Sequence, residues 1–442
     1  SPWTLREARI PGTDELTVGH LWVWTFRTTW NPVGGMTDVY SVDIWRNLND
    51  LPMWNHPFTG VPIPFRADFQ VETAGPQGKL EVPANAVMLD YENDTWRPVG
   101  ENIQSTSKVT LDYSKYFQST WHHGEAITMA DVIYSIYQSF DIAYDKKKSS
   151  IETAMAVTSR PFLDTFNGIR ILDENRLEVY VDFWHFEENY IASYASLSSL
   201  PMPWELLWSM DNLVFNKRQG AYSDTAAARF DVDWLSLVLS RDARRVKNSL
   251  NDIDQFKQAL DGIFTINGRT LISAQDVQRR HQAVLDWWDR YEMLVISNGP
   301  FMLTRYDPPA QFAELQAFRA PGYPFSPGDW DFGKPDLVSF QNVETRALQI
   351  GFEESLKVDL KGPGKLGLRY LLFDPVTGGT LISGLAEEIT AGEFNIPLDS
   401  KITSQMQPGL YQLFLAGYSD KLSTTTERQV NLEATLEAPQ TQ

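Results

Sequence analysis

The distribution of tryptophan divides this sequence into two parts. All 15 tryptophans lie between Trp3 and Trp330, and none occurs from Asp336 to Gln442. Residues 320–335, between these parts, are dense in proline and glycine, which interrupt helices and strands alike. We therefore predict a domain boundary in this stretch, with a first domain over residues 1–330 and a second over residues 331–442.

Short apolar runs recur through the second domain and predict strands. Turn-forming residues separate them, including Gly362-Pro-Gly364, Gly378-Gly379 and Pro408-Gly409. Alternating runs of about five residues between turns are typical of antiparallel strands, and a series of them of a β-sandwich. We predict an all-β, immunoglobulin-like sandwich here, ending in a polar linker at residues 437–442.

The first domain mixes helical and strand periodicity. Thr128 can cap a helix with Asp131 at its third position, and the same pattern recurs at residues 272–277. Apolar residues then follow at helical spacing in both segments, and a third helix is expected around residues 252–260. Residues 177–183 alternate as a strand. Interleaved helices and strands predict an α/β fold.

Composition excludes several classes of function. The formal net charge of −19 argues against nucleic-acid binding, because phosphate recognition needs a surplus of Lys and Arg. The absence of cysteine excludes a disulfide scaffold, a thiolate metal site and a cysteine nucleophile. No stretch approaches the roughly 18 apolar residues that a membrane-spanning helix needs.

No catalytic or metal-binding pattern emerges from the polar residues. His122 and His123 next to Glu125 suggest zinc, but adjacent side chains on a strand point to opposite faces. Paired glutamates such as Glu187-Glu188 do not provide the ~5 Å carboxyl separation of a retaining glycosidase. Residues 362–367 lack the Gly-Lys-Ser/Thr ending of a phosphate loop. We therefore predict a protein that is not an enzyme and carries no metal and no cofactor.

Tryptophan abundance is the remaining functional signal. Tryptophan combines a large apolar area with one hydrogen-bond donor, which suits ligand clefts and stacking on sugars or peptides. For any single tryptophan, a place in the core is the simpler interpretation. Trp287 and Trp288 must straddle two faces of a helix, and we expect Trp288 in the core.

One segment carries a family resemblance. Trp121-His-His-Gly-Glu-Ala-Ile-Thr-Met-Ala-Asp-Val132 resembles the signature of the family 5 extracellular solute-binding proteins, which leads from a strand into a helix. The stretches 296–308, 30–32 and 175–181 are similar to further family segments, so the resemblance covers about residues 17–330. The Trp-His-His-Gly variant looks like the branch found in archaea and some deep-branching bacteria.

The resemblance implies a fold, a function and a set of ligand-binding positions. The fold would be two lobes of the type II periplasmic-binding-protein class, closing over an oligopeptide or an oligosaccharide. The protein would be extracellular, held at the cell surface by a segment outside the printed sequence, and would deliver its ligand to an ABC-transporter permease. Family position and side-chain type together select the candidate ligand-binding residues Trp24, Trp30, Asp38, Tyr40, Trp45, Trp121, His122, Trp184 and Trp204.

Two departures from the family pattern keep other interpretations open. The family continues into a further lobe after the segment that 296–308 resembles, whereas here the predicted sandwich follows. Residues 1–12 read like an interior segment, so we expect a larger precursor whose other piece, a second polypeptide, supplies the complementary lobe. A structural role at the cell surface, as part of a lattice, filament or stalk, is the main alternative. A glycan-acting hydrolase is a third.

Overall fold

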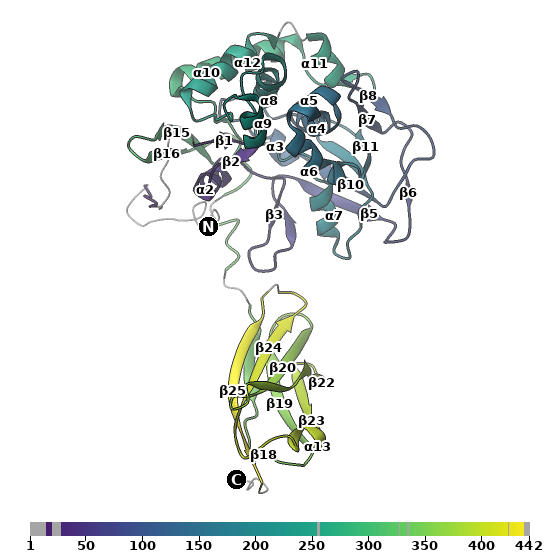
Figure 1. Cartoon of the computed structure of the whole chain (residues 1–442). Helices are drawn as coiled ribbons and strands as arrows, with labels where there is room; N and C mark the ends of the chain where they lie inside the picture. Colours follow the sequence, from purple (N-terminus) through teal and green to yellow (C-terminus); the bar gives the residue numbers. More distant parts are fainter. Residues whose placement is uncertain are drawn as a thin grey trace. The chain divides into compact units, whose positions relative to one another are not determined.

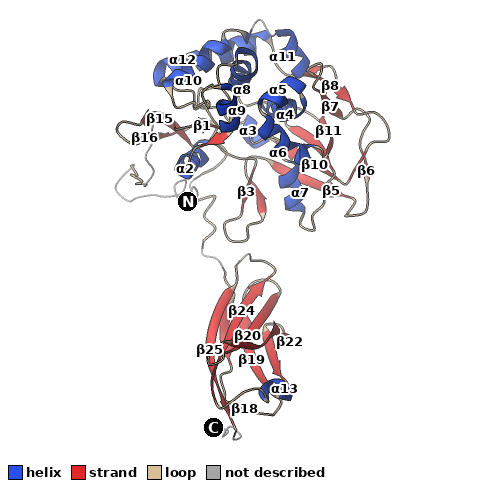
Figure 2. Ribbon diagram, in the orientation of Figure 1, coloured by secondary structure: helices blue, strands red, loops and turns tan. Residues whose placement is uncertain are grey.

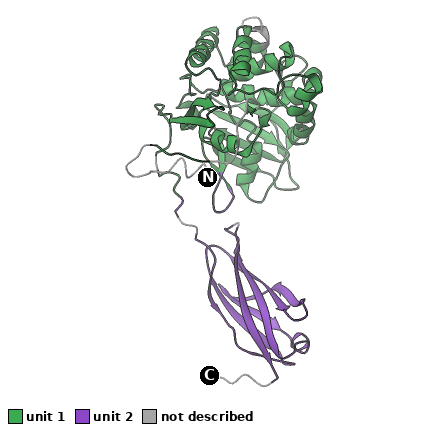
Figure 3. Ribbon diagram, turned by 60° about the vertical axis from the view of Figure 1, so that its left-hand side comes forward, with its two compact units in different colours: residues 1–54, 62–331 green, residues 55–61, 332–442 purple. Residues whose placement is uncertain are grey.

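The chain forms two compact units. The computed structural model describes residues 15–19, 28–253, 257–326, 328–333, 336–422 and 424–436, with the side chains of residues 257–259 left out. Unit 1 comprises residues 1–54 and 62–331, and unit 2 comprises residues 55–61 and 332–442 (Figure 3). The division between Asp331 and Phe332 lies beside the boundary that the proline- and glycine-rich stretch predicts.

A six-stranded antiparallel sheet forms one side of unit 1, with strand order β5-β10-β12-β11-β7-β8 (Figures 1 and 2). Strand β10 alternates buried and half-buried residues, whereas β12, in the middle of the sheet, is buried from its second residue onward. The predicted strand at 177–183 corresponds to β12. The strands of this sheet are β5 Asp68–Thr73, β7 Val87–Asp90, β8 Thr95–Pro98, β10 Ser107–Asp112, β11 Phe166–Ile171 and β12 Arg176–Val181.

Short two-stranded sheets complete the strands of unit 1. They pair β1 with β2, β3 with β4, β6 with β9, β13 with β14 and β15 with β16. Their bounds are β1 Trp30–Asn31, β2 Gly35–Met36, β3 Met53–Asn55, β4 Pro62–Pro64, β6 Leu80–Glu81, β9 Gln104–Ser105, β13 Thr265–Ile266, β14 Arg269–Thr270, β15 Phe301–Asp307 and β16 Phe312–Ala317.

Helices of unit 1 begin where the sequence signals predict. Capping boxes at Thr128 with Asp131 and at Ser273 with Asp276 start α4 and α12, which confirms both helix predictions. The predicted helix at 252–260 is displaced: α10 ends at Leu250 and α11 covers Lys257–Ile263, with residues 254–256 outside the described part. The helices are α2 Val39–Leu48, α3 Ser114–Phe117, α4 Met129–Tyr144, α5 Lys146–Ile151, α6 Thr153–Leu163, α7 Glu188–Ala195, α8 Trp204–Asp211, the π-helical η1 Asn212–Lys217, α9 Asp224–Phe230, α10 Ser240–Leu250, α11 Lys257–Ile263 and α12 Ala274–Tyr291.

The proline- and glycine-rich stretch is irregular, as predicted, but its first part is fixed to unit 1. The Tyr323 hydroxyl donates to Asp50 Oδ2 at 2.9 Å, and the buried Arg66 donates to the same oxygen at 2.9 Å. Phe325 stacks on the buried Phe65 with ring centroids 4.7 Å apart. This part of the junction therefore belongs to the packed body of unit 1.

Unit 2 is a β-sandwich of two sheets. One has the order β17-β19-β23-β22 and the other β18-β25-β24-β20-β21, and their inward-facing residues form a shared apolar core. The elements are β17 Ser339–Val343, β18 Leu348–Gln349, β19 Glu354–Lys361, β20 Leu366–Asp374, β21 Gly379–Leu385, β22 Glu387–Thr390, β23 Glu393–Leu398, α13 Ser400–Thr403, β24 Gly409–Ser419 and β25 Thr426–Thr435.

A tyrosine fastens the corner between β23 and β24. The buried Tyr411 near the start of β24 accepts a hydrogen bond from the Gln407 N–H at 2.8 Å and donates to the Gln407 carbonyl at 3.3 Å. A tyrosine whose hydroxyl bonds to the backbone a few residues upstream is a known way to fasten a corner of a β-sandwich. The chain is thus mixed α/β in unit 1 and a β-sandwich in unit 2.

No helix within the described ranges is both long enough and apolar enough to cross a lipid bilayer.

Candidate functional site

An open hollow of about 710 Å³ lies in unit 1, over the turn that carries the family-like segment. One wall is the turn 122–125 and the other is the exposed side of α12, with contributions from β15 and the residue after β16. Its lining residues are His122, His123, Gly124, Glu125, Arg279, Gln282, Ala283, Asp286, Trp287, Arg290, Tyr291, Met302 and Phe318.

Aromatic rings form a connected group in this hollow. The His122 ring lies nearly parallel to Trp287, with centroids 6.4 Å apart, and meets the edge of Phe318 at 4.9 Å. Trp287 in turn contacts Tyr291, one helical turn further along α12, at 4.4 Å. Tyr291 and Phe318 are half-buried, so they offer ring surface to a ligand. Such a platform suits the flat or apolar faces of a guest molecule.

Charged groups of both signs surround the aromatic platform. Arg279 pairs with Glu125 at 2.7 Å and with Asp276 at 3.0 Å. Gln282 donates to Asp286 at 2.7 Å, and the Arg290 guanidinium lies 5.0 Å from the Tyr291 ring centroid. These charged and polar side chains can therefore offer both hydrogen-bond donors and acceptors beside the aromatic rings.

His122 is held in one protonation state. Its Nδ1 accepts from the Ser297 N–H at 3.2 Å, and its Nε2 lies 3.0 Å from the Gly299 carbonyl, so Nε2 carries the proton. Burial lowers the pKa of His122 to about 4. The ring is thus neutral at pH 7 and serves as a fixed part of the platform.

Behind the hollow, Arg280 joins the turn to two helices through a buried charge network. Its guanidinium donates to both Asp131 oxygens at 3.0 Å, to Glu205 at 2.9 Å and to the Ala126 carbonyl at 2.6 Å. Both carboxylates and the arginine are buried. Since these residues lie on α12, α4 and α8, the network fixes three helices against the turn.

His123 extends this network on the side away from His122. Its Nε2 lies 2.9 Å from Glu205 Oε1. Burial alone would raise the pKa of Glu205, but attraction to Arg280 and the hydrogen bond with His123 outweigh it and lower that pKa to about 2. The two adjacent histidines lie in a turn and not on a strand, as was assumed from the sequence, and their rings have different polar partners.

Among the described residues, no group of three or more His, Cys, Asp or Glu is placed to hold a metal ion.

Three of the candidate tryptophans lie inside the protein. Trp30, Trp121 and Trp204 are at most 1% exposed. Trp30 packs near Tyr306, with ring centroids 6.0 Å apart, and Trp204 contacts Phe264 at 4.9 Å. These rings support the core and have no surface open to a ligand in this structure.

The other candidates are spread over several places. Asp38 caps α2, where its carboxylate accepts from the Ser41 N–H at 2.8 Å, and Tyr40 and Trp45 lie half-buried on the same helix. Trp184 is 38% exposed on the loop after β12. Trp24 lies outside the described residues. Of the eight candidates that the structure describes, His122 alone lines the hollow.

Several lining residues were not among the candidates. The sequence places Trp287 and Trp288 on two faces of a helix without marking Trp287 as a ligand contact, and it does not mark Tyr291, Phe318 or Arg290. The spacing of Trp287 and Tyr291, which places both on one side of α12, is a signal that could have identified the platform. Trp288 is buried, in line with the prediction.

Comparison with known proteins assigns no family. No protein-family model matches the chain, and no curated protein matches it. An engineered protein shares 12% identity over 23% of this chain and 20% of its own, with a TM-score of 0.19. OgpA from Akkermansia muciniphila shares 13% identity over 27% of this chain and 33% of its own, with a TM-score of 0.19. Murine CRIg shares 7% identity over 22% of this chain and 95% of its own, with a TM-score of 0.17. Likenesses this slight carry no argument about function.

Proposed function

We propose that this chain is an extracytoplasmic ligand-binding protein that captures oligopeptides or oligosaccharides for an ABC importer. The observation that carries the proposal is the hollow itself, where the turn at 122–125 meets the aromatic and charged side of α12. The same turn carries the resemblance to the family 5 solute-binding proteins. The proposal includes type II binding-protein lobes for unit 1 and an immunoglobulin-like fold for unit 2.

The chemistry of the hollow supports a ligand with both apolar and polar parts. Tyr291, which contacts Trp287, and Phe318, which contacts His122, can pack against a sugar ring or an apolar peptide side chain. Arg290, Asp286 and Gln282 can then bond the ligand's hydroxyl, amide or charged groups. Because the hollow is open, we further propose that a complementary polypeptide supplies its opposing wall, which would remove water from these bonds.

Fluorescence titration tests this function. Peptide and oligosaccharide libraries are titrated into the full chain while tryptophan emission is followed, since Trp287 lies in the hollow. We expect selected ligands to quench the emission, and Tyr291→Ala to weaken their affinity about three- to tenfold, the value of one aromatic contact.

Tyr91→Ala is the matched control, because Tyr91 is also part of an aromatic pair on the surface, with Tyr144, but does not line the hollow. The proposal fails if no ligand changes the emission, with or without the complementary polypeptide. It also fails if both tyrosine variants bind equally well.

A structural role at the cell surface is the second candidate. The observation that favours it is the uncharged edge strand β21 of unit 2. Electron microscopy separates the two functions, because an ordered polymer supports the structural role whereas discrete particles that respond to ligand support capture.

A further inference from the structure

The sequence contains one acceptor motif for N-linked oligosaccharides. These oligosaccharides are attached to asparagine in the pattern Asn-x-Ser/Thr, in which x is any residue except proline. Across the 442 residues, Asn93-Asp94-Thr95 is the single stretch that fits this pattern. A pattern of three residues also arises by chance, so its value as a signal depends on where the structure places it.

The motif lies at the tip of the hairpin that joins β7 to β8. Asp90 lies opposite Thr95 in the ladder, which leaves residues 91–94 as the turn. The Asp90 carbonyl accepts a hydrogen bond from the Asn93 N–H at 3.1 Å, and Asp94 closes the turn with a left-handed φ of 50°. The asparagine is therefore displayed on a defined surface turn, the setting that this motif requires.

The residues on either side of Asn93 fasten the hairpin to the helices of unit 1. Each of the other three turn residues contacts α4 or α5 through its side chain. These contacts are the stacking of Tyr91 on Tyr144 with ring centroids 5.8 Å apart, the ion pair of Glu92 with Lys146 at 3.4 Å, and the hydrogen bond from the Tyr137 hydroxyl to the Asp94 carboxylate at 2.8 Å. In β8, the Trp96 indole donates to the Ile263 carbonyl of α11 at 2.7 Å. The turn is thus held in place without any contribution from the Asn93 side chain.

Asn93 differs from these neighbours because it is exposed and its side chain bonds only beside the turn. Among the described residues, its Nδ2 donates to Asp90 Oδ2 at 3.1 Å. This bond lies at the surface, where water can replace it at little cost. An oligosaccharide on Nδ2 would therefore extend into solvent without displacing a packed side chain.

The third residue of the motif is also accessible. The transferase recognises the hydroxyl of this residue, which is why the motif ends in serine or threonine. The Thr95 methyl group faces α11, since a Cβ added at Gly262 would lie 3.2 Å from Thr95 Cγ2. The Thr95 hydroxyl makes no hydrogen bond within the described part of the chain and is not closed off from solvent. Both groups that the reaction needs are therefore available on the same turn.

We propose that Asn93 carries an N-linked oligosaccharide. This inference rests on the proposed extracytoplasmic location, because this modification belongs to secreted proteins. The oligosaccharide comes from a lipid-linked phosphate donor. Asn93 Nδ2 forms a bond with C1 of the first sugar and loses a proton, while the bond between C1 and the phosphate oxygen breaks. The lipid phosphate leaves with the electron pair of that bond and takes up the proton.

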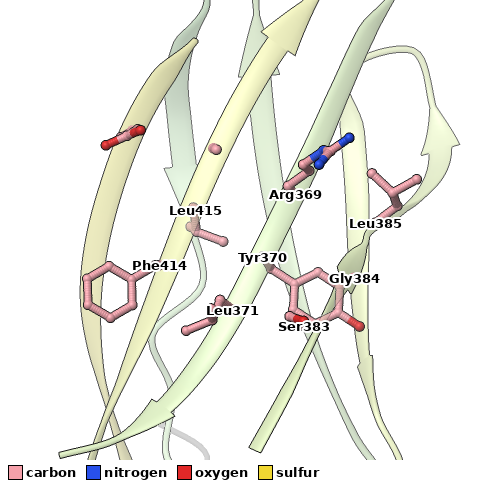
Figure 4. Close-up of a pocket in the computed structure, with 10 residues that line it drawn as sticks. Arg369, Tyr370, Leu371, Ser383, Gly384, Leu385, Phe414 and Leu415 are labelled. Atoms are coloured by element: carbon pink, nitrogen blue, oxygen red, sulfur yellow. The ribbon is translucent and has the colours of Figure 1, made fainter. Parts of the chain in front are cut away.

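Unit 2 has no acceptor of this kind. None of its asparagines is followed two positions later by serine or threonine; they are Asn55, Asn342, Asn395 and Asn431. Its five-stranded sheet carries an open hollow of about 620 Å³ lined in part by the exposed apolar side chains of Leu385 and Phe414 (Figure 4). No N-linked oligosaccharide is attached beside that apolar face. The expected product is one oligosaccharide on unit 1 and none on unit 2, which the masses of proteolytic fragments can check.

Mass spectrometry of the full chain tests the proposal. The chain is produced behind a secretory signal in a eukaryotic host that attaches N-linked oligosaccharides, and in parallel in a bacterial cytoplasm that does not. We expect the secreted chain to be heavier by one oligosaccharide. Peptide N-glycosidase should remove this mass and leave an aspartate at position 93, which tandem mass spectrometry locates. A secreted chain without added mass at Asn93 overturns the proposal.

Single substitutions show that the motif directs the attachment. Asn93→Gln and Thr95→Ala should each abolish the added mass, whereas Thr95→Ser keeps the hydroxyl and should retain it. Asn102→Gln is the matched control, because Asn102 is also exposed with a left-handed φ of 63° but Gln104 stands where the motif needs a hydroxyl. An Asn102→Gln variant that loses the oligosaccharide, or an Asn93→Gln variant that keeps it, contradicts the assignment. Urea unfolding should give the same midpoint for Asn93→Gln and wild type made in bacteria, which shows that the variant is folded.

The chain isolated from its own cells separates this proposal from the proposed location. A chain found at the cell surface with an unmodified Asn93 overturns the oligosaccharide and leaves the location standing. A chain found in the cytoplasm overturns both. A surface chain whose added mass is released by peptide N-glycosidase, or by chemical deglycosylation, and maps to Asn93 supports both.

Discussion

Replacing Arg280 by methionine removes the one cation at the centre of the buried network. Methionine keeps much of the apolar stem but none of the four hydrogen bonds to Asp131, Glu205 and the Ala126 carbonyl. Two buried carboxylates then lack their cation. Breaking a buried ion pair by removing one partner costs about 3–5 kcal/mol. We expect a loss of this size in the unfolding free energy of unit 1 at pH 7.

Against the effect of burial, attraction to Arg280 and the hydrogen bond with His123 together lower the pKa of the Glu205 carboxyl from 4.5 to about 2, which stabilises the folded wild type. A lowered folded-state pKa means that this stability is present above pH 4.5 and is lost as the pH falls toward 2. In the Arg280→Met variant, Asp131 and Glu205 no longer have the arginine beside them, so protonation of these carboxylates removes an unfavourable buried charge. The destabilisation should therefore shrink as the pH falls from 7 to 4.

Urea unfolding followed by tryptophan emission measures this loss. All 15 tryptophans lie between Trp3 and Trp330, so the emission reports the first unit and not the sandwich. Arg279→Met is the matched control on the same helix, because the Arg279 side chain is 52% exposed and its ion pairs lie at the surface. The Arg279→Met substitution should lower the unfolding free energy by less than about 1 kcal/mol. Equal losses in both variants, or a loss at Arg280 that does not change with pH, would refute the reasoning.

Two further predictions concern single side chains. His122→Gln keeps a hydrogen-bond donor and an acceptor but cannot bind a proton. Because burial lowers the folded-state pKa of His122 to about 4, the unfolding free energy of the wild type should fall by about 3 kcal/mol relative to the variant between pH 6.5 and pH 4. Urea unfolding at each pH measures this difference. Unfolding free energies that change equally with pH in the wild type and in His122→Gln would contradict this prediction. Tyr411→Phe removes two hydrogen bonds at the β23–β24 corner and should destabilise the sandwich by about 1–2 kcal/mol, seen as faster amide exchange in β24. Tyr418→Phe, on the outer face of the same strand, is its control and should leave that exchange unchanged.

Local signals in the sequence predicted local structure well. Thr128 with Asp131 and Ser273 with Asp276 give hydrogen bonds within a single turn, so their spacing alone predicted where α4 and α12 begin. Two of the apolar runs that predict strands in the second domain are residues 366–373 and 410–415. They fall within β20 and β24, because alternation along a strand is also a local signal.

Partners far apart in the sequence could not be predicted. Asp131 also pairs with Arg280, 149 positions later, and no spacing rule connects the two. Tryptophan abundance could not separate Trp121, which lies wholly in the core, from Trp287, which is also buried but lines the hollow. Composition likewise marked the 320–335 junction as irregular but not the stacking of Phe325 on Phe65.

The corner held by Tyr411 has a consequence for where this protein can mature. Antibody domains carry their second disulfide cysteine two residues after a corner tyrosine, whereas the residue two positions after Tyr411 is the fully buried Leu413. Neither the hydrogen bonds of the Tyr411 hydroxyl nor the aliphatic side chain of Leu413 is broken by thiols or formed by oxidation. Unit 2 should therefore reach its native state equally well in a reducing cell interior and in an oxidising medium, with no need for disulfide-forming enzymes.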